Sequence, residues 1–370
     1  MSTTVGILGG GQLGRMLFQQ GANYPVQLKF LDKDPEGPCG SICKNVTQGN
    51  PLDFNDVLAF GRTCDVVSIE IEAVNTEALY QLRDEGIKII PSPEAIETIR
   101  DKGLQKECYT KHNIATMPFH LVHDSVPTSY FSYPFVQKKR QGGYDGKGVQ
   151  VFQNEEDLLQ WFTCPSIVEE GAEIQTEIAV IVGRSPSGES LILPECEMIF
   201  DPKYNLVSHL QMPSRLNKSQ QQDAQKLALS VVDALDSPGI FAIEMFLLKD
   251  GRLVVNETAP RTHNSGHATI ESLTISQFEL HLRVLLDLPL PSVEVIAPAI
   301  MINIIGSGKE GNAQIKGLHK IAQLPNTYLH WYGKSLSKPG RKMGHITVLD
   351  PDTPASMVDT ILKTLQVIGK

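Results

Sequence analysis

Four short apolar runs alternate with stretches of helical periodicity across the first hundred residues. The runs are Val5–Leu8, Gln27–Leu31, Val66–Ile71 and Ile87–Ile90. Short apolar runs that alternate with helices are typical of a parallel α/β sheet. A Pro-Ser-Pro segment at residues 91–93 follows the last run, and each proline disfavours helix in the residue before it. The sequence therefore predicts an N-terminal Rossmann-like α/β domain over residues 1–94.

Two further units are predicted downstream. Residues 95–166 hold two helical stretches and a few strands around a glycine-rich loop. Residues 167–370 form a larger unit, which ends in a β-rich segment from about residue 299 and a terminal helix. The strands and helices predicted in the larger unit are Ile174–Val182, Ile240–Leu248, Leu253–Asn256, Lys218–Leu235 and Ile275–Leu286.

The charge of the chain limits the classes of partner. The 370 residues carry a formal net charge of −9 and contain no long run of lysine and arginine. Nucleic acid and anionic membrane are therefore poor partners, since both attract basic surfaces. An anionic small-molecule substrate must then be held by a local cluster of basic side chains.

Cysteine usage and hydropathy predict a soluble protein of the cytoplasm. The six cysteines form no Cys-x-x-Cys pair, which favours free thiols in a reducing compartment. The chain lacks the basic start of a signal peptide, and no stretch approaches the ~20 apolar residues of a membrane span. The cysteines are Cys39, Cys43, Cys64, Cys108, Cys164 and Cys196.

A first glycine cluster, Gly9–Gly14, follows the first predicted strand and matches the pattern G-x-G-x-x-G. Asp32 ends the next predicted strand, where a dinucleotide-binding protein places the carboxylate that binds ribose. Taken alone, these features favour a nicotinamide-dependent oxidoreductase. The physical requirement is broader, because backbone N–H groups at a helix N-terminus attract any anion. The cluster therefore predicts a site for a phosphorylated ligand without selecting NAD.

A second glycine cluster is stronger evidence for a polyphosphate site. The strand predicted at Val136–Lys138 leads to Gly142–Gly148, in which four of the seven residues are glycine. Such a loop frees backbone N–H groups to form an anion-binding nest, and basic residues flank it. Ordering the loop costs conformational entropy, so we expect it to close over a bound polyphosphate. The alternative is a mobile hairpin tip, which leaves Tyr144 and Asp145 without a role.

Two glutamates are brought together by a predicted β-hairpin. Asp250-Gly251 is a preferred two-residue hairpin loop, and with that loop the numbers of paired residues sum to 501. Glu244 and Glu257 meet this condition and would face each other. Like charges ~5 Å apart are destabilising unless a cation lies between them. The pair therefore predicts an Mg²⁺ site for substrate phosphates, the alternative being a solvated sheet face.

Four further segments stand out in the chain: Gly143–Gly148 (GYDGKG), Asn256–His267 (NETAPRTHNSGH), Ser276–Arg283 (SQFELHLR) and Lys338–His345 (KPGRKMGH). Together with the order of the motifs above, they resemble the ATP-grasp ligases, and among them the family of 5-(carboxyamino)imidazole ribonucleotide synthetases of purine biosynthesis. The resemblance covers nearly the whole chain. It implies an ATP-grasp fold with α/β and α+β parts, in which a biotin-carboxylase-like domain is followed by a lid over residues 95–166 and an ATP-grasp domain over residues 167–370.

The same resemblance implies residues for binding ATP and magnesium. Lys102 and Lys138 would contact the phosphates, and Glu177 would bind the ribose hydroxyls. Glu244 and Glu257 would hold Mg²⁺ beside Asn256. The flap over the phosphates would comprise Gly143, Tyr144, Asp145, Gly146, Lys147, Gly148 and Val149. The hinge strand, which would recognise adenine through its backbone, would comprise Glu169, Glu170, Gly171 and Ala172.

The resemblance also implies residues for the second substrate, an imidazole ribonucleotide. Lys334 and Arg341 would bind its 5′-phosphate. Glu70 and Glu72 would share one face of a strand, so either could contact the ribose. The catalytic contacts would be Tyr144, Asp145, Arg261, His263 and Asn264, and the ribose would lie along Gln12, Leu13 and one of the two glutamates.

The implied reaction joins bicarbonate to the exocyclic amine of 5-aminoimidazole ribonucleotide while ATP is converted to ADP and phosphate, in a cytoplasmic homodimer. Lys102 departs from relatives that often carry arginine there, and Leu191–Leu216 matches too loosely to imply roles. Three alternatives stay open at this point: a formate-using ligase of the same fold, a nicotinamide oxidoreductase, and a non-catalytic nucleotide sensor. The paired Glu244 and Glu257 argue against the sensor.

Overall fold

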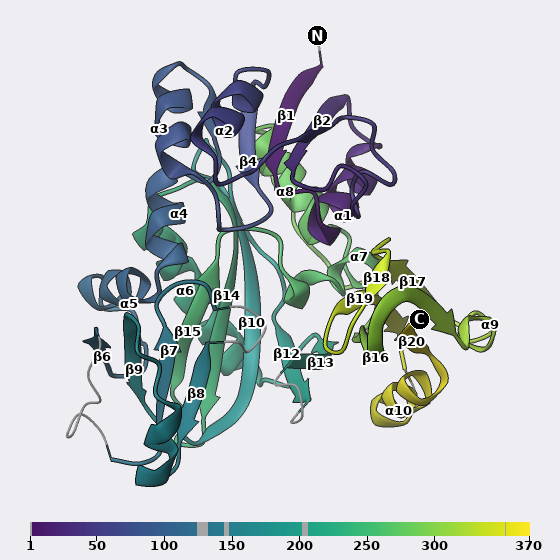
Figure 1. Ribbon diagram of the computed structural model, residues 1–370. Coiled ribbons are helices and arrows are strands. Elements are labelled where there is room, and N and C mark those ends of the chain that lie inside the picture. Colours follow the sequence, from purple (N-terminus) through teal and green to yellow (C-terminus); the bar gives the residue numbers. More distant parts are fainter. Residues whose placement is uncertain (1, 124–131, 144–147, 202–205, 352) are drawn as a thin grey trace.

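The structure is a computed structural model, and it describes residues 2–123, 132–143, 148–201, 206–351 and 353–370. Within these residues the strands form three sheets. In Figure 1 the N-terminal sheet lies at the top, the four-stranded sheet at the lower left, and the largest sheet between them and out to the right. The N-terminal sheet has five strands, a smaller sheet has four, and the largest has eleven.

The N-terminal sheet is parallel, as predicted, with the strand order β3-β2-β1-β4-β5. Helices α1 (Gln12–Gly21), α2 (Phe54–Gly61) and α3 (Thr76–Asp84) connect its strands. Strand β4 ends at Ile69, two residues before the predicted end. The strands are β1 (Thr3–Leu8), β2 (Val26–Asp32), β3 (Val46–Gln48), β4 (Val66–Ile69) and β5 (Lys88–Ile89).

Two helices, α4 (Pro93–Arg100) and α5 (Lys102–Lys111), lead from this sheet to the four-stranded sheet. Asp101 separates the helices, and its carboxylate caps α5 by accepting hydrogen bonds from the N–H groups of Gly103 and Leu104. The small sheet is antiparallel with the order β6-β9-β7-β8. Its elements are β6 (Phe119–Val122), β7 (Phe135–Lys139), β8 (Val149–Phe152), the 3₁₀ helix η1 (Glu155–Gln160) and β9 (Ser166–Glu170).

The largest sheet has the main order β15-β14-β10-β12-β13-β16-β19-β17, and its paired strands are antiparallel. Three short strands join it at the side: β11 pairs with β10, and β18 and β20 pair with β16. Its strands are β10 (Ile174–Arg184), β11 (Ser190–Ile192), β12 (Cys196–Asp201), β13 (Leu206–Met212), β14 (Gly239–Leu248), β15 (Leu253–Ala259), β16 (Ala299–Lys316), β17 (Thr327–Trp331), β18 (Leu336–Ser337), β19 (Lys342–Leu349) and β20 (Gln366–Gly369).

The helices of this half follow the predicted pattern. Helix α6 spans Lys218–Leu235, as predicted, and begins where the Asn217 side chain accepts a hydrogen bond from the Gln220 N–H. The predicted helix at Ile275–Leu286 is α8 (Gln277–Leu285). The other elements are the 3₁₀ helix η2 (Asn264–Gly266), α7 (Thr269–Ser272), α9 (Leu318–Ile321) and α10 (Pro354–Thr364).

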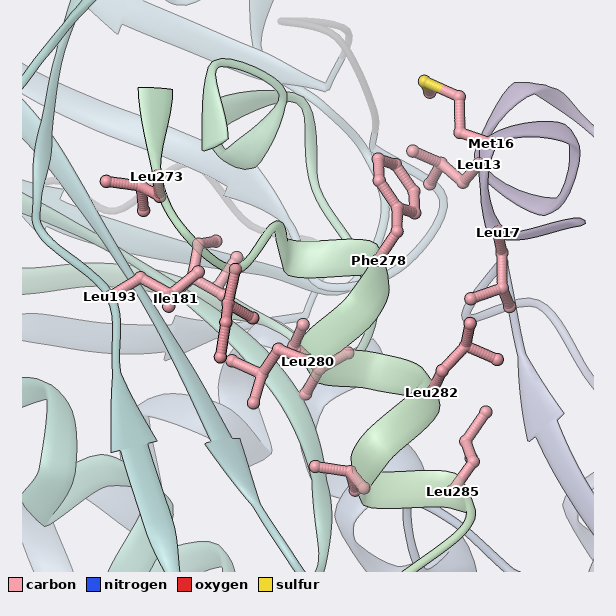
Figure 2. Packing of buried hydrophobic residues seen from close by; sticks show 14 of the residues in the cluster. Leu13, Met16, Leu17, Ile181, Leu193, Leu273, Phe278, Leu280, Leu282 and Leu285 are labelled. Atoms are coloured by element: carbon pink, nitrogen blue, oxygen red, sulfur yellow. The ribbon is translucent and has the colours of Figure 1, made fainter. Parts of the chain in front are cut away.

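Helix α8 attaches the N-terminal domain to the largest sheet. Figure 2 shows its apolar side chains between Leu13 and Leu17 of α1 on one side and Ile181 and Leu193 of the sheet region on the other. Full burial of each such side chain contributes roughly 1.5–3 kcal/mol. This packing fixes the N-terminal glycine cluster against the rest of the protein.

In the described part of the chain, no helix is both long enough and apolar enough to cross a membrane. All six cysteines are free thiols, as predicted.

Candidate active site

A cleft of about 640 Å³ lies where the three sheets approach one another. The N-terminal domain contributes the glycine cluster and residues 70–73, and the helices α4 and α5 contribute residues 99–105. The stem after β7 contributes residues 140–143. The largest sheet contributes Glu257, the residues that follow β15, and two side chains of the β-rich segment, Tyr332 and Lys342. The predicted residues Gln12, Leu13, Arg261, His263 and Asn264 all line this cleft.

The first glycine cluster already holds carboxylates of the protein itself. The Gly10 N–H donates to Asp32 Oδ2 at 2.6 Å, and the N–H groups of Gly11 and Leu13 donate to the two Glu70 oxygens at 2.5 and 2.9 Å. These are the donors that would have to hold a dinucleotide pyrophosphate. The oxidoreductase prediction therefore has no physical support here, because its anion site is filled by Asp32 and Glu70.

Glu70 and Glu72 have different environments, and the prediction that they share one face of a strand is wrong. Strand β4 ends at Ile69, so both glutamates lie in the bend that follows. Glu70 is buried against the glycine cluster, and burial raises the pKa of its carboxyl. Glu72 reaches across the cleft to Arg261, with 2.8 Å between Oε1 and the Arg261 Nε. Glu70 therefore shapes the cleft wall, and Glu72 is the glutamate better placed to contact a ligand.

Glu244 and Glu257 are paired across β14 and β15 as predicted, but the hairpin differs from the prediction. Next to the turn the numbers of paired residues sum to 500, as for Leu247 and Leu253, and the Gly251 N–H donates to the Leu248 carbonyl. The loop therefore has three residues, with Gly251 in the left-handed region at φ +88°. A bulge between Glu244 and Met245 adds one residue on β15 and restores the sum of 501.

The carboxylates of this pair are surrounded by basic groups. Glu257 forms an ion pair with Lys102, the first residue of α5. Burial lowers the pKa of Lys102 to about 8, and the nearby charge of Lys138 acts in the same direction. Burial raises the pKa of Glu244, whose Oε1 lies 3.6 Å from the His263 Nε2. Two carboxylates and the neighbouring Asn256 amide oxygen are hard ligands of the kind that Mg²⁺ prefers. No group of three metal-binding side chains is assembled within the described residues.

A buried charge network lies beside this pair. The Glu169 carboxylate sits between Lys106 and Lys138, with 2.5 Å from each ammonium nitrogen to a carboxylate oxygen. Burial opposes ionisation of Glu169, but the two ammonium groups outweigh it and lower its pKa to about 2. Lys138 also donates to Asn256 Oδ1 at 2.7 Å. Lys106 was not among the predicted site residues, although it lies four residues after Lys102 and thus near the same face of a helix.

The predicted hinge strand is β9 and the residues after it. The Glu169 side chain belongs to the charge network, whereas Glu170 is exposed. The N–H groups of Glu170 and Gly171 donate to the carbonyls of Pro118 and Pro134. On β10, the next strand along the chain, burial raises the pKa of Glu177 to about 7, and the nearby Glu244 charge adds to this effect.

The residues predicted to contact the ribonucleotide are held by a network of polar contacts. Asn264 and Asn303 exchange side-chain hydrogen bonds of 2.9 and 3.0 Å. The His263 Nδ1 accepts a hydrogen bond from the Ser265 N–H, which leaves the proton on Nε2, the nitrogen that faces Glu244. Burial, with the charges of Arg261 and Lys342, lowers the pKa of His263 well below its usual value. His263 is therefore a neutral donor beside a carboxylate.

Lys334 and Arg341, predicted to bind a phosphate, are not among the residues that line the cleft. The Lys334 Nζ donates to the Lys342 carbonyl at 2.7 Å, and the Arg341 Nη1 donates to the Leu336 carbonyl at 2.9 Å. The cation that lines the cleft in this segment is Lys342, which was not among the predicted residues although it follows Arg341 directly. Arg100 is a further cleft cation that was not predicted, and Arg140 is one of the basic residues predicted to flank the glycine loop.

The predicted flap is only partly described. Tyr144, Asp145, Gly146 and Lys147 lie outside the described residues, so their roles stay predictions. The stem before them is tied to α5, because Asp101 accepts hydrogen bonds from the Arg140 Nε at 2.7 Å and the Gln141 Nε2 at 3.1 Å. The Gly142 and Gly143 backbone lines the cleft directly beside this stem, and Gly148 and Val149 resume the chain at β8.

Comparison with known proteins agrees with this geometry. Three family models match in order: a ribonucleotide synthetase preATP-grasp domain over residues 1–100, an ATP-grasp domain over residues 107–278 and a phosphoribosylaminoimidazole carboxylase C-terminal domain over residues 299–357. The N5-carboxyaminoimidazole ribonucleotide synthase of Synechococcus elongatus is 34% identical, over 93% of this chain and 89% of that protein. The chain belongs to the family of N5-carboxyaminoimidazole ribonucleotide synthases. The family assignment and the ATP-grasp fold predicted from the sequence are thereby confirmed.

Solved structures of this family superimpose on most of the chain. The synthetase from Thermotoga maritima has a TM-score of 0.89 and 36% identity, with full coverage of both chains. The synthase from Aspergillus clavatus, solved with ADP and 5-aminoimidazole ribonucleotide, has a TM-score of 0.88 and 35% identity, over 98% of this chain and 97% of that one. Some relatives are longer: the phosphoribosylaminoimidazole carboxylase of Ogataea methanolica is 38% identical over 94% of this chain, which spans 66% of that protein's length.

Proposed function

We propose that this chain is an ATP-dependent carbon–nitrogen ligase, which carboxylates the exocyclic amine of 5-aminoimidazole ribonucleotide with bicarbonate and releases ADP and phosphate. The single observation that carries the proposal is one cleft that brings Glu257 together with Arg261, His263 and Lys342. Glu257 belongs to the carboxylate pair suited to a metal-bound triphosphate, whereas Arg261, His263 and Lys342 suit an anionic second substrate.

The lysines of the buried network would bind ATP. Lys138 and Lys102 both lie beside the carboxylate pair and its neighbour Asn256, where they can neutralise charge on the phosphates. Mg²⁺, held by Glu244 and Glu257, would supply charge neutralisation at the transferred phosphoryl group. Glu177 would accept hydrogen bonds from the ribose, and residues 169–172 would contact adenine. Each of these roles is supported by position and by the family resemblance.

The proposed reaction has two steps. A bicarbonate oxygen attacks the γ-phosphorus, and the bond to the ADP oxygen breaks to give carboxyphosphate and ADP. The substrate amine then bonds to the carboxyl carbon, either in carboxyphosphate itself or in the CO₂ that it releases; phosphate leaves, and the amine gives up a proton. Arg261 would hold the carboxyl group, and Asn264 and His263 would orient the ribonucleotide beside it. Asp145 on the flap would take the amine proton. The closed cleft must exclude water, since carboxyphosphate hydrolyses readily.

Lys342 would bind the 5′-phosphate from the wall of the cleft, with Lys334 and Arg341 supporting this segment. Gln12, Leu13 and Glu72 would lie along the ribose. We also propose a cytoplasmic homodimer, which the family resemblance supports.

A formate-using ligase of the same fold is the alternative, and product analysis separates the two. The protein is incubated with ATP, Mg²⁺, 5-aminoimidazole ribonucleotide and ¹³C-bicarbonate, and the products are followed by ¹³C NMR. We expect a new carbamate signal that grows with ADP release. Formate-dependent ADP release without a bicarbonate-derived signal would contradict the proposal.

A further inference from the structure

His267 is a buried polar side chain on the wall of the cleft, and none of the roles described above uses it. It lines the cleft together with Asn264, Tyr332 and Lys342. The residue is only 1% exposed. A buried imidazole needs hydrogen-bond partners, because an unsatisfied polar group in a low-dielectric interior is destabilising.

One imidazole nitrogen of His267 has a partner that fixes the position of the ring proton. The Gln277 Oε1 accepts a hydrogen bond from the His263 N–H at 2.8 Å, so the other terminal atom of this amide is the NH₂ group. That group donates to the His263 carbonyl at 2.8 Å and lies 3.0 Å from the His267 Nδ1. The Nδ1 must therefore be the acceptor, and the proton of the neutral ring is on Nε2.

The ring plane is also fixed. The His267 imidazole stacks on the His345 ring at 4.7 Å between centroids, and it stacks on the Phe278 ring at 5.9 Å. His330 stacks on His345 at 4.4 Å and binds Glu271 through Nε2. Figure 2 shows Phe278 reaching from α8 towards Leu13 of α1, so this side of the stack is anchored in the core between the domains. Rotation of the His267 ring would disrupt its stacking on Phe278 and His345.

His267 stays uncharged in this environment. Burial lowers its pKa well below the usual value, and His263, His330, Lys342 and Arg261 all act in the same direction. The described contacts give it no carboxylate partner, since Glu271 is paired with His330 and Glu72 with Arg261. A neutral histidine whose Nδ1 already accepts a hydrogen bond can offer only the Nε2–H donor.

We infer that His267 is a ribonucleotide-binding residue, whose Nε2–H donates a hydrogen bond to an unprotonated nitrogen or oxygen of the ligand. The Nδ1 edge of the ring faces Gln277, so the opposite edge is the one available to the cleft. His267 lines the cleft with Lys342 and with Asn264, whose carbonyl accepts a hydrogen bond from the His267 N–H, at the end proposed for the ribonucleotide rather than for ATP. This inference rests on the proposed function. It adds a second neutral imidazole donor to the site, beside that of His263.

The test compares two substitutions that separate the contributions of the two ring nitrogens of His267. The asparagine side chain of His267→Asn keeps a polar group near the Nδ1 position but removes the Nε2–H donor. His267→Gln places an amide nitrogen near the Nε2 position. We expect His267→Asn to raise the KM for the ribonucleotide about tenfold, with the KM for ATP and kcat within twofold of wild type. His267→Gln should recover part of the loss, and the effect should be the same at pH 6.5 and pH 8.5.

His281→Asn is the matched control, because His281 is also fully buried and its Nε2 contacts the Ser68 hydroxyl at 3.2 Å, away from the cleft. Its kinetic constants should equal those of wild type even if its thermal stability falls. An unchanged ribonucleotide KM in folded His267→Asn would overturn the inference, as would an equal rise in both KM values. If His267→Asn does not fold, His267→Met, which has no donor, takes its place, and calorimetry compares the binding of the ribonucleotide to His267→Met and to His267→Gln. Wild-type affinity of His267→Met would overturn the inference. A wild-type protein without carboxylation activity would instead refute the proposed function.

Discussion

Glu244 lies directly opposite Glu257 across strands β14 and β15, and two departures from the simplest hairpin combine to produce this pairing. The three-residue loop moves the register by one residue, and the bulge at Asn256 moves it back. The bulge also has a consequence of its own, since Asn256 is left free of the ladder and accepts a hydrogen bond from Lys138. The same irregularity thus aligns the carboxylates and adds an amide oxygen beside them.

Substitution of one carboxylate should abolish phosphoryl transfer. We expect Glu257→Gln to lower ADP release at least a hundredfold at saturating Mg²⁺, because metal stabilisation of the transferred phosphoryl group is worth several kcal/mol. Exposed Glu173, on the loop before β10, provides the control Glu173→Gln, which should keep wild-type turnover. Near wild-type ADP release by Glu257→Gln, measured with a coupled assay, would refute the metal-site assignment.

The two neighbouring cations of the β-rich segment should differ in effect. Lys342 lines the cleft, whereas the Arg341 guanidinium is bonded to the Leu336 carbonyl. A charge-assisted hydrogen bond to a phosphate contributes ~1.5–3 kcal/mol, so Lys342→Ala should raise the KM for the ribonucleotide roughly tenfold to a hundredfold. The KM for ATP should change little in both variants, and Arg341→Ala should have the smaller effect. A larger effect of Arg341→Ala in steady-state kinetics would support the prediction from sequence that Arg341 binds the 5′-phosphate.

Glu177 should make stability depend on pH. Its pKa is raised to about 7 from its usual value of 4.5, chiefly by burial, so the folded protein binds more protons than the unfolded chain between these values. Its contribution to stability is therefore fully present below pH 4.5 and is lost as pH rises through 7. We expect Glu177→Gln to remove this loss, which amounts to about 1–3 kcal/mol after allowance for partial exposure.

Denaturant titrations of wild type and Glu177→Gln at pH 5 and pH 7.5 measure this difference. Wild type should become less stable relative to the variant at the higher pH. Parallel pH dependence of the two proteins would show that Glu177 keeps an ordinary pKa.

The buried charge network should be sensitive to loss of its single carboxylate. Glu169→Gln leaves Lys106 and Lys138 buried without their counter-charge, which destabilises by about 3–5 kcal/mol. The exposed pair of Lys226 and Asp223 is the matched comparison, because Asp223→Asn removes a surface pair worth about 0–1 kcal/mol. Urea denaturation followed by fluorescence should show a large fall in the midpoint for the first variant alone. Equal midpoints would mean that the network is not a stabilising ion pair.

Local patterns were sufficient to predict much of the fold. The apolar runs of the parallel sheet and the long helix Lys218–Leu235 are encoded by neighbours in sequence, so their periodicity identifies them. Glu244 and Glu257 could also be paired in advance, although the prediction used a two-residue loop where the chain has three residues and a bulge. The final register was correct because the two differences cancel.

Contacts between distant segments could not be predicted in the same way. The carboxylate of Glu70 lies within the glycine cluster because the sheet order places the end of β4 beside β1, and no spacing in the sequence records this. The ion pairs of Glu169 with Lys106 and Lys138 likewise depend on how α5 packs against the four-stranded sheet. Lys342 adjoins a predicted residue, but only the packing of β19 decides which side chain of that pair reaches the cleft.

The most direct test of the proposed reaction is ADP release with each substrate omitted in turn. Purified protein is assayed with ATP and Mg²⁺ in carbon-dioxide-free buffer, and bicarbonate and 5-aminoimidazole ribonucleotide are added separately and together. We expect rapid ADP release only when both are present, with one ADP formed per carboxylated product. ADP release that is unaffected by omission of bicarbonate, or that needs formate in its place, would contradict the account.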